Sequence, residues 1–461
     1  MVLVMTTALP TTSYNYPLAE PKAYPVIGHA LDYRLNPLSF YSQCAKQGDF
    51  VKLRFGPHPV YFLNHPDLIK EVFVTQGANF VARPEGRESR FFDPLFGHGL
   101  LAVNESTFWR RQRRLMVPLF QRHHLVGYGQ NAVTLTQSLL HTWHHGDQVE
   151  IRTAMLALGR QIIAQIALGE VGLAQVELIA TAFDASLREY DHRDRNWLLY
   201  LMPERLPTPS NRRYQQATAR LDRWLNDTIK AGRAHPPDDG SMLAQFLAAR
   251  DDTGATMTDQ EIRDELVTVL IGHDTVADIF CWAWWKIAQH PEVEANLLAE
   301  WQRVLGGRSP TLDDIPHLPY TEGVAKETLR LYPLAWVSGR VANADCEIAG
   351  HSIKAGENVV MCQWVTHRDR RFFSDPEVFD PSRWSADRAK QISSHAYFPF
   401  GGGARICIGQ GLTMMEVVLL LAEIGQRFQL RPLPQQSVVP HPGPSFSLRP
   451  KHGLRVEILA R

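Results

Sequence analysis

The spacing of apolar residues along the chain predicts mostly helices, with short strands in two regions. Residues 50–64 alternate between apolar and polar side chains and turn at Gly56-Pro57, a pattern typical of a β-hairpin. Residues 335–362 also indicate short strands, which turn at Gly350 and Gly356. The fold class that this pattern predicts is mainly α with small β-sheets.

Helical periodicity dominates from about residue 105 to residue 305, where prolines separate one helix from the next. Residues 236–254 indicate a surface loop around a short helix. Three further helices are predicted in the second half of the chain: residues 291–305, 320–331 and 410–428.

One predicted helix is longer than the others. Thr258 and Glu261 have the spacing of a capping box, and no proline follows before Pro291. The pattern therefore predicts a helix of about 30 residues, or about 45 Å. Its middle, residues 266–272, is apolar on every face, which is typical of a helix that crosses the protein core.

Composition and charge limit the class of protein. The 461 residues are 44% hydrophobic and 21% charged, as in a folded globular chain. Lys plus Arg and Asp plus Glu both number 48, so the basic excess of a nucleic-acid-binding protein is absent. The five cysteines contain no C-x-x-C, which indicates a reducing compartment rather than a disulfide framework. The apolar start, residues 1–5, is too short to cross a bilayer. We expect a soluble, cytoplasmic, monomeric protein without a membrane anchor.

The stretch from Phe400 to Gly409, FGGGARICIG, carries the most specific chemical signal. Three consecutive glycines would let the backbone approach a flat ligand closely. Cys407 precedes a predicted helix, where free N–H groups and the helix dipole favour a thiolate. Such a sulfur suits either nucleophilic attack or metal ligation, but no His and Asp are placed to complete a nucleophilic triad with it.

Phe400, Gly403, Arg405, Cys407 and Gly409 fill the pattern F-x-x-G-x-R-x-C-x-G, which resembles the haem-binding loop of the cytochrome P-450 superfamily. The resemblance implies that Cys407 is the axial ligand of haem b iron, that Arg405 binds a haem propionate and that Phe400 packs on the proximal side. It also implies the cytochrome P-450 fold, a single α-rich domain that encloses haem and has a long central helix. Residues 1–19 would be a proline-containing tail and residues 20–461 the haem domain.

Two further motifs fit the same resemblance. Glu327 and Arg330 match E-x-x-R, and Arg383 ends a downstream F-x-P-x-R; in the family these three residues form a structural ion-pair network. Trp109 and Arg113 match W-x-x-x-R and share a helix face. The resemblance implies that both, together with Arg340, contact the haem propionates.

The sequence Gly272-His273-Asp274-Thr275 lies in the middle of the long helix and resembles the family's oxygen-activating site. Asp274 and Thr275 are the expected catalytic residues, because an acid and a hydroxyl can pass protons to bound oxygen. Thr275 can also hydrogen bond to a carbonyl of its own helix and open it locally. Ile271 departs from the family's Ala or Gly and should narrow the space above the iron.

The resemblance places the substrate pocket among mostly apolar side chains, so we expect a hydrophobic small-molecule substrate that is terpenoid, carotenoid or fatty-acid-like. The expected pocket residues are Phe91, Phe92, Ile271, Trp336, Val337 and Phe446.

The resemblance implies a monooxygenase that uses O2. Because the matching pattern leaves no room for a flavin or nicotinamide domain, electrons from NAD(P)H must arrive through a separate ferredoxin or flavodoxin with its reductase. Arg110, Arg111 and Arg114 form a basic face that could attract such a partner. A peroxide-driven hydroxylase, a haem-thiolate isomerase and a non-enzymatic haem gas sensor are the alternatives.

Overall fold

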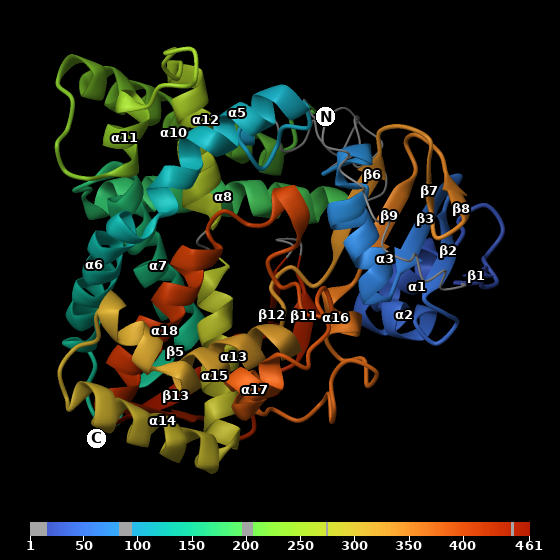
Figure 1. The fold of residues 1–461 in the computed structure, drawn as a ribbon. Coiled ribbons are helices and arrows are strands. Elements are labelled where there is room, and N and C mark those ends of the chain that lie inside the picture. The colour runs from blue at the N-terminus through green and yellow to red at the C-terminus, as the bar shows by residue number, and fades with distance from the viewer. Residues whose placement is uncertain (1–15, 83–94, 196–205, 273–274, 444–446) are drawn as a thin grey trace, which may run out of the picture.

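The computed structural model describes residues 16–82, 95–195, 206–272, 275–443 and 447–461. Helices make up most of this part of the chain, and a mixed sheet lies at one side of the molecule (Figure 1). The main helices are α5 (Ser106–Met116), α6 (Arg122–Leu140), α7 (Ile151–Leu168), α8 (Leu173–Arg195), α10 (Pro209–Ala234), α11 (Met242–Ala248), α12 (Asp259–Gly272), α13 (Val276–Gln289), α14 (Pro291–Leu305), α15 (Pro319–Leu331) and α18 (Gln410–Arg427).

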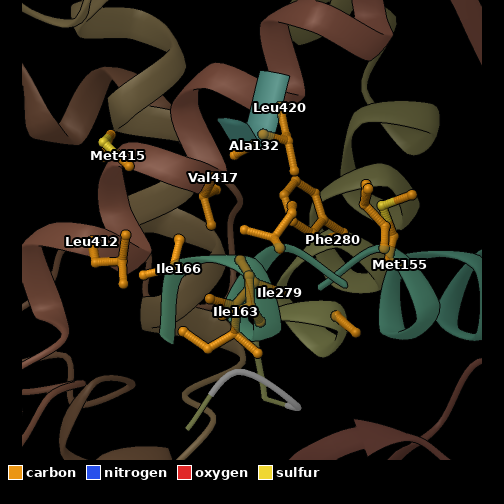
Figure 2. Close-up of a cluster of buried hydrophobic side chains, with 14 of the residues drawn as sticks. Ala132, Met155, Ile163, Ile166, Ile279, Phe280, Leu412, Met415, Val417 and Leu420 are labelled. Atoms are coloured by element: carbon orange, nitrogen blue, oxygen red, sulfur yellow. The ribbon is translucent and has the colours of Figure 1, made fainter. Parts of the chain in front are cut away.

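The core lies where α6, α7, α13 and α18 pack against one another. Figure 2 shows how their side chains meet: Ala132 comes from α6, Ile163 from α7, Phe280 from α13, and Val417 and Leu420 from α18. Each of these side chains is at most 2% exposed, and a large buried aliphatic or aromatic side chain contributes about 1.5–3 kcal/mol. The core therefore fixes α13 and α18, the two helices whose first turns follow Thr275 and Cys407.

The largest sheet has six strands in the order β1-β2-β3-β9-β6-β4. The hairpin of β2 and β3 pairs Phe50 with Leu63, and β9 joins β3 in parallel. Its strands are β1 (Leu18–Ala19), β2 (Phe50–Phe55), β3 (His58–Leu63), β4 (Phe80–Val81), β6 (Ser338–Ala342) and β9 (Asn358–Met361).

Both faces of this sheet are covered. Successive residues of a strand point to opposite faces, and in β3 the side chains of Val60 and Phe62 join one buried cluster while Tyr61 and Leu63 join another. The first cluster includes α2 (Pro37–Cys44), and the second includes α3 (Pro66–Lys70) and the following π-helical turn η1 (Glu71–Thr75). The sheet therefore holds η1 in a fixed position.

Three smaller sheets complete the fold. One joins β10 (Phe428–Pro432), β13 (Arg455–Ala460) and β5 (Gln148–Glu150), and the others pair β11 (Pro440–Pro442) with β12 (Leu448–Pro450) and β7 (Cys346–Ile348) with β8 (His351–Ile353).

The helices and strands predicted from the sequence are confirmed in these positions. The capping box at the start of the long helix is also present: the Thr258 N–H donates to Glu261 Oε2 over 2.7 Å, and the Glu261 N–H donates to Thr258 Oγ1 over 3.2 Å. In the described residues this helix consists of α12 and α13, on either side of positions 273 and 274.

The same helix is the feature of the described chain that most resembles a membrane span. Residues Asp259–Gln289 are long and apolar enough to cross a bilayer, as are α7 and α8 if that bent pair is counted as one span. About three-quarters of the apolar window in Asp259–Gln289 is buried inside the protein. Its apolar character is therefore explained by its path through the core.

Candidate active site

Cys407 lies just before α18, as expected, and its side chain is accessible to solvent. Protein nevertheless surrounds the sulfur, and burial raises the pKa of the thiol. The N–H groups of Gly409 and Gln410 and the Arg113 guanidinium lower that pKa but do not outweigh burial. The N–H groups at the helix terminus therefore act toward the thiolate, as expected, and burial opposes them. A metal cation at the sulfur would remove the proton.

Two of the three glycines before Cys407, Gly402 and Gly403, are required for packing against η1. A Cβ at Gly403 would lie 1.8 Å from the carbonyl oxygen of Phe73, and one at Gly402 would lie 2.5 Å from its ring. The backbone of Gly403 also has a φ of 67°, which favours glycine. Phe73 was not identified from the sequence, and it fixes the loop from the side of the sheet.

Three arginines predicted to bind haem gather around the cysteine loop. The guanidinium carbon of Arg405 lies 4.5 Å from the centre of the Trp109 ring, and that of Arg113 lies 5.5 Å from the same centre. Arg405 also donates to the carbonyls of Val103 and Asn104 over 3.2 and 3.3 Å. These contacts orient both guanidiniums beside the indole.

Arg340 completes this group of three. Its guanidinium carbon lies 5.0 Å from the centre of the Phe73 ring, and its Nη1 donates to the Gly339 carbonyl over 2.8 Å. Burial, with the charge of Arg405 second, lowers the pKa of Arg340 to about 10. Burial also lowers the pKa values of Arg405 and Arg113.

Among the described residues, no carboxylate balances the charge of this arginine group. In the part of the chain that the structure describes, the charged groups acting on Arg113, Arg340 and Arg405 are one another and the Cys407 sulfur, with no carboxylate among them. Half-buried guanidiniums without an acid are typical of an anion-binding site. The two propionates of a haem would supply the missing negative charges, so these residues fit that group.

A second arginine group surrounds Glu327, and here every charge has a partner. Arg330 binds both carboxylate oxygens of Glu327 over 2.8 and 2.9 Å, and Arg383 donates to Oε1 over 3.3 Å. The Asp380 N–H and the Trp384 indole N–H each add a hydrogen bond of 3.0 Å to the same carboxylate. Glu327 and Arg330 are fully buried.

His367 connects the Glu327 network with the cysteine loop. Its carbonyl accepts from Arg330 over 2.8 Å, and its Nε2 accepts the backbone N–H of Phe398 over 3.0 Å. Burial, then the charges of Arg330 and Arg368, lower the pKa of His367 to about 3, so the ring is neutral at physiological pH. Phe400, two residues later, is partly buried against the main core and accepts the Cys407 N–H through its carbonyl over 2.9 Å. No motif in the sequence points to His367.

The long helix is irregular next to Thr275. The Thr275 hydroxyl donates to the Gly272 carbonyl over 2.9 Å, as expected for a threonine that opens its own helix. Gly272 is exposed although Leu270 and Val276 on either side are buried, and a Cβ added at Gly272 would meet nothing within 4 Å. Ile271 is partly buried against the core. Asp274, the second expected catalytic residue, lies outside the described residues.

The predicted pocket residues need one correction. Trp336 is only 5% exposed and packs in the cluster of α2 and the large sheet, with its ring centroid 6.2 Å from that of Tyr41. Its neighbour Ala335 is exposed and Val337 partly so, since successive residues of an extended chain point to opposite sides. Ala335 therefore replaces Trp336 as a candidate wall residue. The other predicted positions, Phe91, Phe92 and Phe446, lie outside the described residues.

The basic face of α5 is smaller than the sequence indicated. Arg111 binds Asp251 over 2.6 Å and Glu261 over 2.7 Å, and so ties α5 to the start of α12. Arg114 pairs with Asp252 at the surface. Arg110 is exposed. A depression of about 480 Å³ lies beside it, lined by Thr107, Trp109, Arg110, Arg113, Arg114, Val117 and Pro118.

Comparison with known proteins identifies the family. The family model for cytochrome P-450 matches residues 18–456. A "Cyclooctatin synthase" from Streptomyces melanosporofaciens is 34% identical and aligns over 96% of each chain. A "Cyclooctat-9-en-7-ol 5-monooxygenase" from the same organism is 34% identical over 90% of this chain and 89% of its own. A "Pentalenene oxygenase" from Streptomyces avermitilis is 32% identical over 91% and 92%.

A solved structure shows the same fold. The crystal structure of the cytochrome P450DA heme domain matches 97% of this chain and 99% of its own length with a TM-score of 0.85, at 23% sequence identity. The family model and the relatives cover nearly all of the chain, and the expected mainly α fold with small sheets is confirmed. The chain therefore belongs to the cytochrome P-450 family of oxygen-incorporating oxidoreductases.

Proposed function

We propose that this protein is a haem-thiolate monooxygenase that inserts one oxygen atom of O2 into an apolar, terpenoid-like substrate, by hydroxylation or epoxidation. The observation that supports this most strongly is the position of an accessible cysteine beside three arginines that have no carboxylate partner in the described part of the chain.

Each group around the cysteine has a role in holding haem b. Cys407 would ligate the iron, and Arg113, Arg340 and Arg405 would bind the propionates. The Trp109 indole keeps two of these guanidiniums in place. When bound, the haem supplies the activation of O2. The Glu327 network and His367 keep the cysteine loop rigid, which preserves the position of the sulfur.

Proton delivery belongs to the irregular turn of the long helix. The Thr275 hydroxyl already points its proton at the Gly272 carbonyl, so its lone pairs can accept a hydrogen bond from a water molecule or from Asp274. We propose that Asp274 and Thr275 pass protons toward bound oxygen.

This proposal predicts that Thr275→Ala diverts reducing equivalents into peroxide, lowering coupling about tenfold. Thr268→Ala is the matched control, because the Thr268 hydroxyl also donates to a carbonyl of the same helix, that of Asp264, over 3.0 Å. Equal coupling in both variants would rule out the relay.

The substrate class rests on the wall residues and on the relatives. Ile271, Ala335 and Val337 are apolar and at least partly accessible, and such walls favour a hydrophobic guest. The names of the relatives refer to cyclooctatin and pentalenene chemistry. Both observations support a terpenoid substrate.

Electrons would come from NAD(P)H through a separate ferredoxin or flavodoxin with its reductase. The depression beside Arg110 adjoins Trp109 and Arg113, and it offers exposed positive charge to an acidic partner. We place the reaction in the cytoplasm and expect the protein to act as a monomer.

The experiment that tests this function supplies the purified holoenzyme with a ferredoxin, its reductase, NADPH and isotopically labelled O2. Cyclic terpene hydrocarbons, carotenoids and fatty acids form the substrate panel. The proposal predicts one labelled oxygen atom in a terpenoid product. Product that forms with unlabelled oxygen from added peroxide alone, or an isomerised product without label, would contradict it.

A further inference from the structure

A buried carboxylate lies one turn after Thr275 on the long helix. Asp278 belongs to α13 and is 1% exposed. Its Oδ2 accepts the Ser447 hydroxyl over 2.6 Å, and its Oδ1 accepts Arg152 Nε over 2.7 Å. A carboxylate in such a position is stable only with good partners, and it therefore ties α13 to the residue that precedes β12.

A second side chain on the same face of α13 holds the same strand. Trp282 follows Asp278 by four residues, so both project from one side of the helix. The Trp282 indole N–H donates to the Leu448 carbonyl over 2.8 Å, and both residues are fully buried. Ser447 and Leu448, the residue before β12 and its first residue, are thus bound to two adjacent turns of the helix.

The strand in turn holds the candidate wall of the pocket. The Leu448 N–H donates to the Leu334 carbonyl over 3.0 Å, and Ser447 forms an isolated antiparallel bridge with Ala335. Ala335 is exposed and is the candidate wall residue next to the buried Trp336. Hydrogen bonds therefore connect α13 with Ser447 and Leu448, and Leu448 with Leu334, the residue before Ala335.

These contacts relate the wall to the proton-delivering turn. Asp278 is three residues from Thr275, about 4.5 Å along the helix axis. Because the helix is buried, a displacement at Asp278 also displaces the turn at Thr275. We propose that Asp278 is a positioning residue: through Ser447 it sets the separation between the Thr275 turn and the Ala335 wall, and so determines which substrates fit and how they are oriented. The inference rests on the proposed function, because it assumes that both elements face bound haem.

The magnitude of the effect follows from the geometry of tight sites. A displacement of about 1 Å can change the rate or the binding of a fitted ligand by up to about 100-fold. Removing the Ser447 hydroxyl takes away the link nearest the wall but leaves the Asp278–Arg152 pair intact. The structural effect should therefore fall on the β12 end of the network.

The chain offers a closely matched control. The Thr321 hydroxyl donates to the buried Glu300 carboxylate over 2.7 Å, as the Ser447 hydroxyl donates to Asp278, and it also accepts the Trp301 indole N–H over 2.9 Å. Thr321→Val removes a buried hydroxyl–carboxylate bond between α14 and α15. It should lower thermal stability about as much as Ser447→Ala does, without touching the Asp278 network.

The test measures ligand fit in the holoenzyme rather than activity. Imidazole and 4-phenylimidazole both bind haem iron, but only the second needs space beside it. Spectral titration gives their dissociation constants, and the ratio of the two reports the shape of the space above the haem. We expect Ser447→Ala to change this ratio about tenfold and Thr321→Val to leave it within about twofold of the parent.

The outcomes separate this inference from the proposed function. Asp278→Asn keeps an oxygen that can accept the Ser447 hydroxyl, so it should change the ratio less than Ser447→Ala does. If Ser447→Ala folds poorly, the ratio measured in Asp278→Asn still tests the inference. A ratio that changes equally in Ser447→Ala and Thr321→Val, or in neither, overturns the positioning role while leaving the proposed function intact. A parent protein that binds neither azole with a thiolate-haem spectrum overturns the proposed function, and this inference with it.

Discussion

Two groups of arginines in this protein, one buried and one half-buried, differ in their counter-charges. Around Glu327, the guanidiniums of Arg330 and Arg383 share a carboxylate that the chain itself provides. Around Cys407, Arg113, Arg340 and Arg405 lie near one another without any carboxylate among the described residues. The first group has a counter-charge from the chain itself, whereas the second has none among the residues that the structure describes.

A structural site and a ligand site can therefore be told apart by whether the guanidiniums share a carboxylate of the protein. Buried charges are stable when paired, and like charges in a shared environment oppose one another. The Glu327 group should therefore stabilise the protein with or without haem. The group around Cys407 should gain its stability only when an anionic ligand is bound.

The largest predicted effect comes from removing the carboxylate charge of Glu327. Glu327→Gln leaves Arg330 and Arg383 buried without a counter-charge and should lower the free energy of unfolding by about 3–5 kcal/mol. Chemical denaturation of the purified protein measures this. Glu322→Gln is the control on the same helix: its pair with Lys326 is partly exposed, so the cost should stay below about 0.5 kcal/mol. Equal losses would mean that the network is not stabilising.

The second prediction concerns the unbalanced group. Arg340→Gln should leave the stability of the haem-free protein unchanged or raise it, because the variant relieves repulsion with Arg405. It should speed haem loss about 10–100-fold, since a charge-assisted hydrogen bond contributes about 1.5–3 kcal/mol. Transfer of haem to a scavenger protein measures the loss. A destabilised apoprotein with normal haem retention would reverse the assignment of the two groups.

A third prediction concerns Glu265, a buried acid without a cationic partner among the groups that shift its pKa. Glu265 accepts the Leu100 N–H over 3.1 Å, and burial, with Asp264 and Glu261 adding to it, raises its pKa to about 8. Between pH 4.5 and 8 the folded state keeps a proton that the unfolded state releases. The contribution of Glu265 to stability therefore falls as pH rises through this window. Glu265→Gln should flatten that decline, with a gain on the order of 1–2 kcal/mol at pH 8.

Thermal unfolding of the parent and Glu265→Gln at pH 5.5 and pH 8.5 provides this measurement. Parallel pH dependences in the two proteins would show that Glu265 is ionised in the folded state.

The smallest effect concerns the surface of α5. Arg110→Gln should slow reduction by the electron-transfer partner a few-fold at low salt, with little change at high salt, and leave stability within about 0.5 kcal/mol. Arg111→Gln should instead lower stability by about 1 kcal/mol, because Arg111 binds Asp251 and Glu261. Stopped-flow reduction and denaturation distinguish the two. A slower reduction in Arg111→Gln alone would place the docking charge elsewhere.

Local patterns were sufficient to predict much of the fold. The capping box of Thr258 and Glu261 involves residues three apart, and the β2–β3 hairpin turns over two residues, so each is encoded by its own neighbours. The cysteine motif likewise identified Cys407 and Arg405 because their spacing is short and specific.

Long-range packing could not be predicted in the same way. Phe73 meets Gly403 across 330 residues, and His367 receives the N–H of Phe398 only because the Glu327 network brings them together. Arg111 was assigned to a docking face since its acidic partners lie about 140–150 residues away. Trp336 was assigned to the pocket because hydrophobicity alone does not show which side of an extended segment faces the site.

The central claim is that Cys407 supplies the thiolate ligand of a haem. The most direct measurement is the difference spectrum of the reduced protein with and without carbon monoxide. The account predicts the red-shifted Soret band of a thiolate-ligated haem, and its loss in Cys407→Ala with the helical circular dichroism retained. A parent spectrum typical of histidine ligation, or a thiolate band that persists in Cys407→Ala, would contradict it.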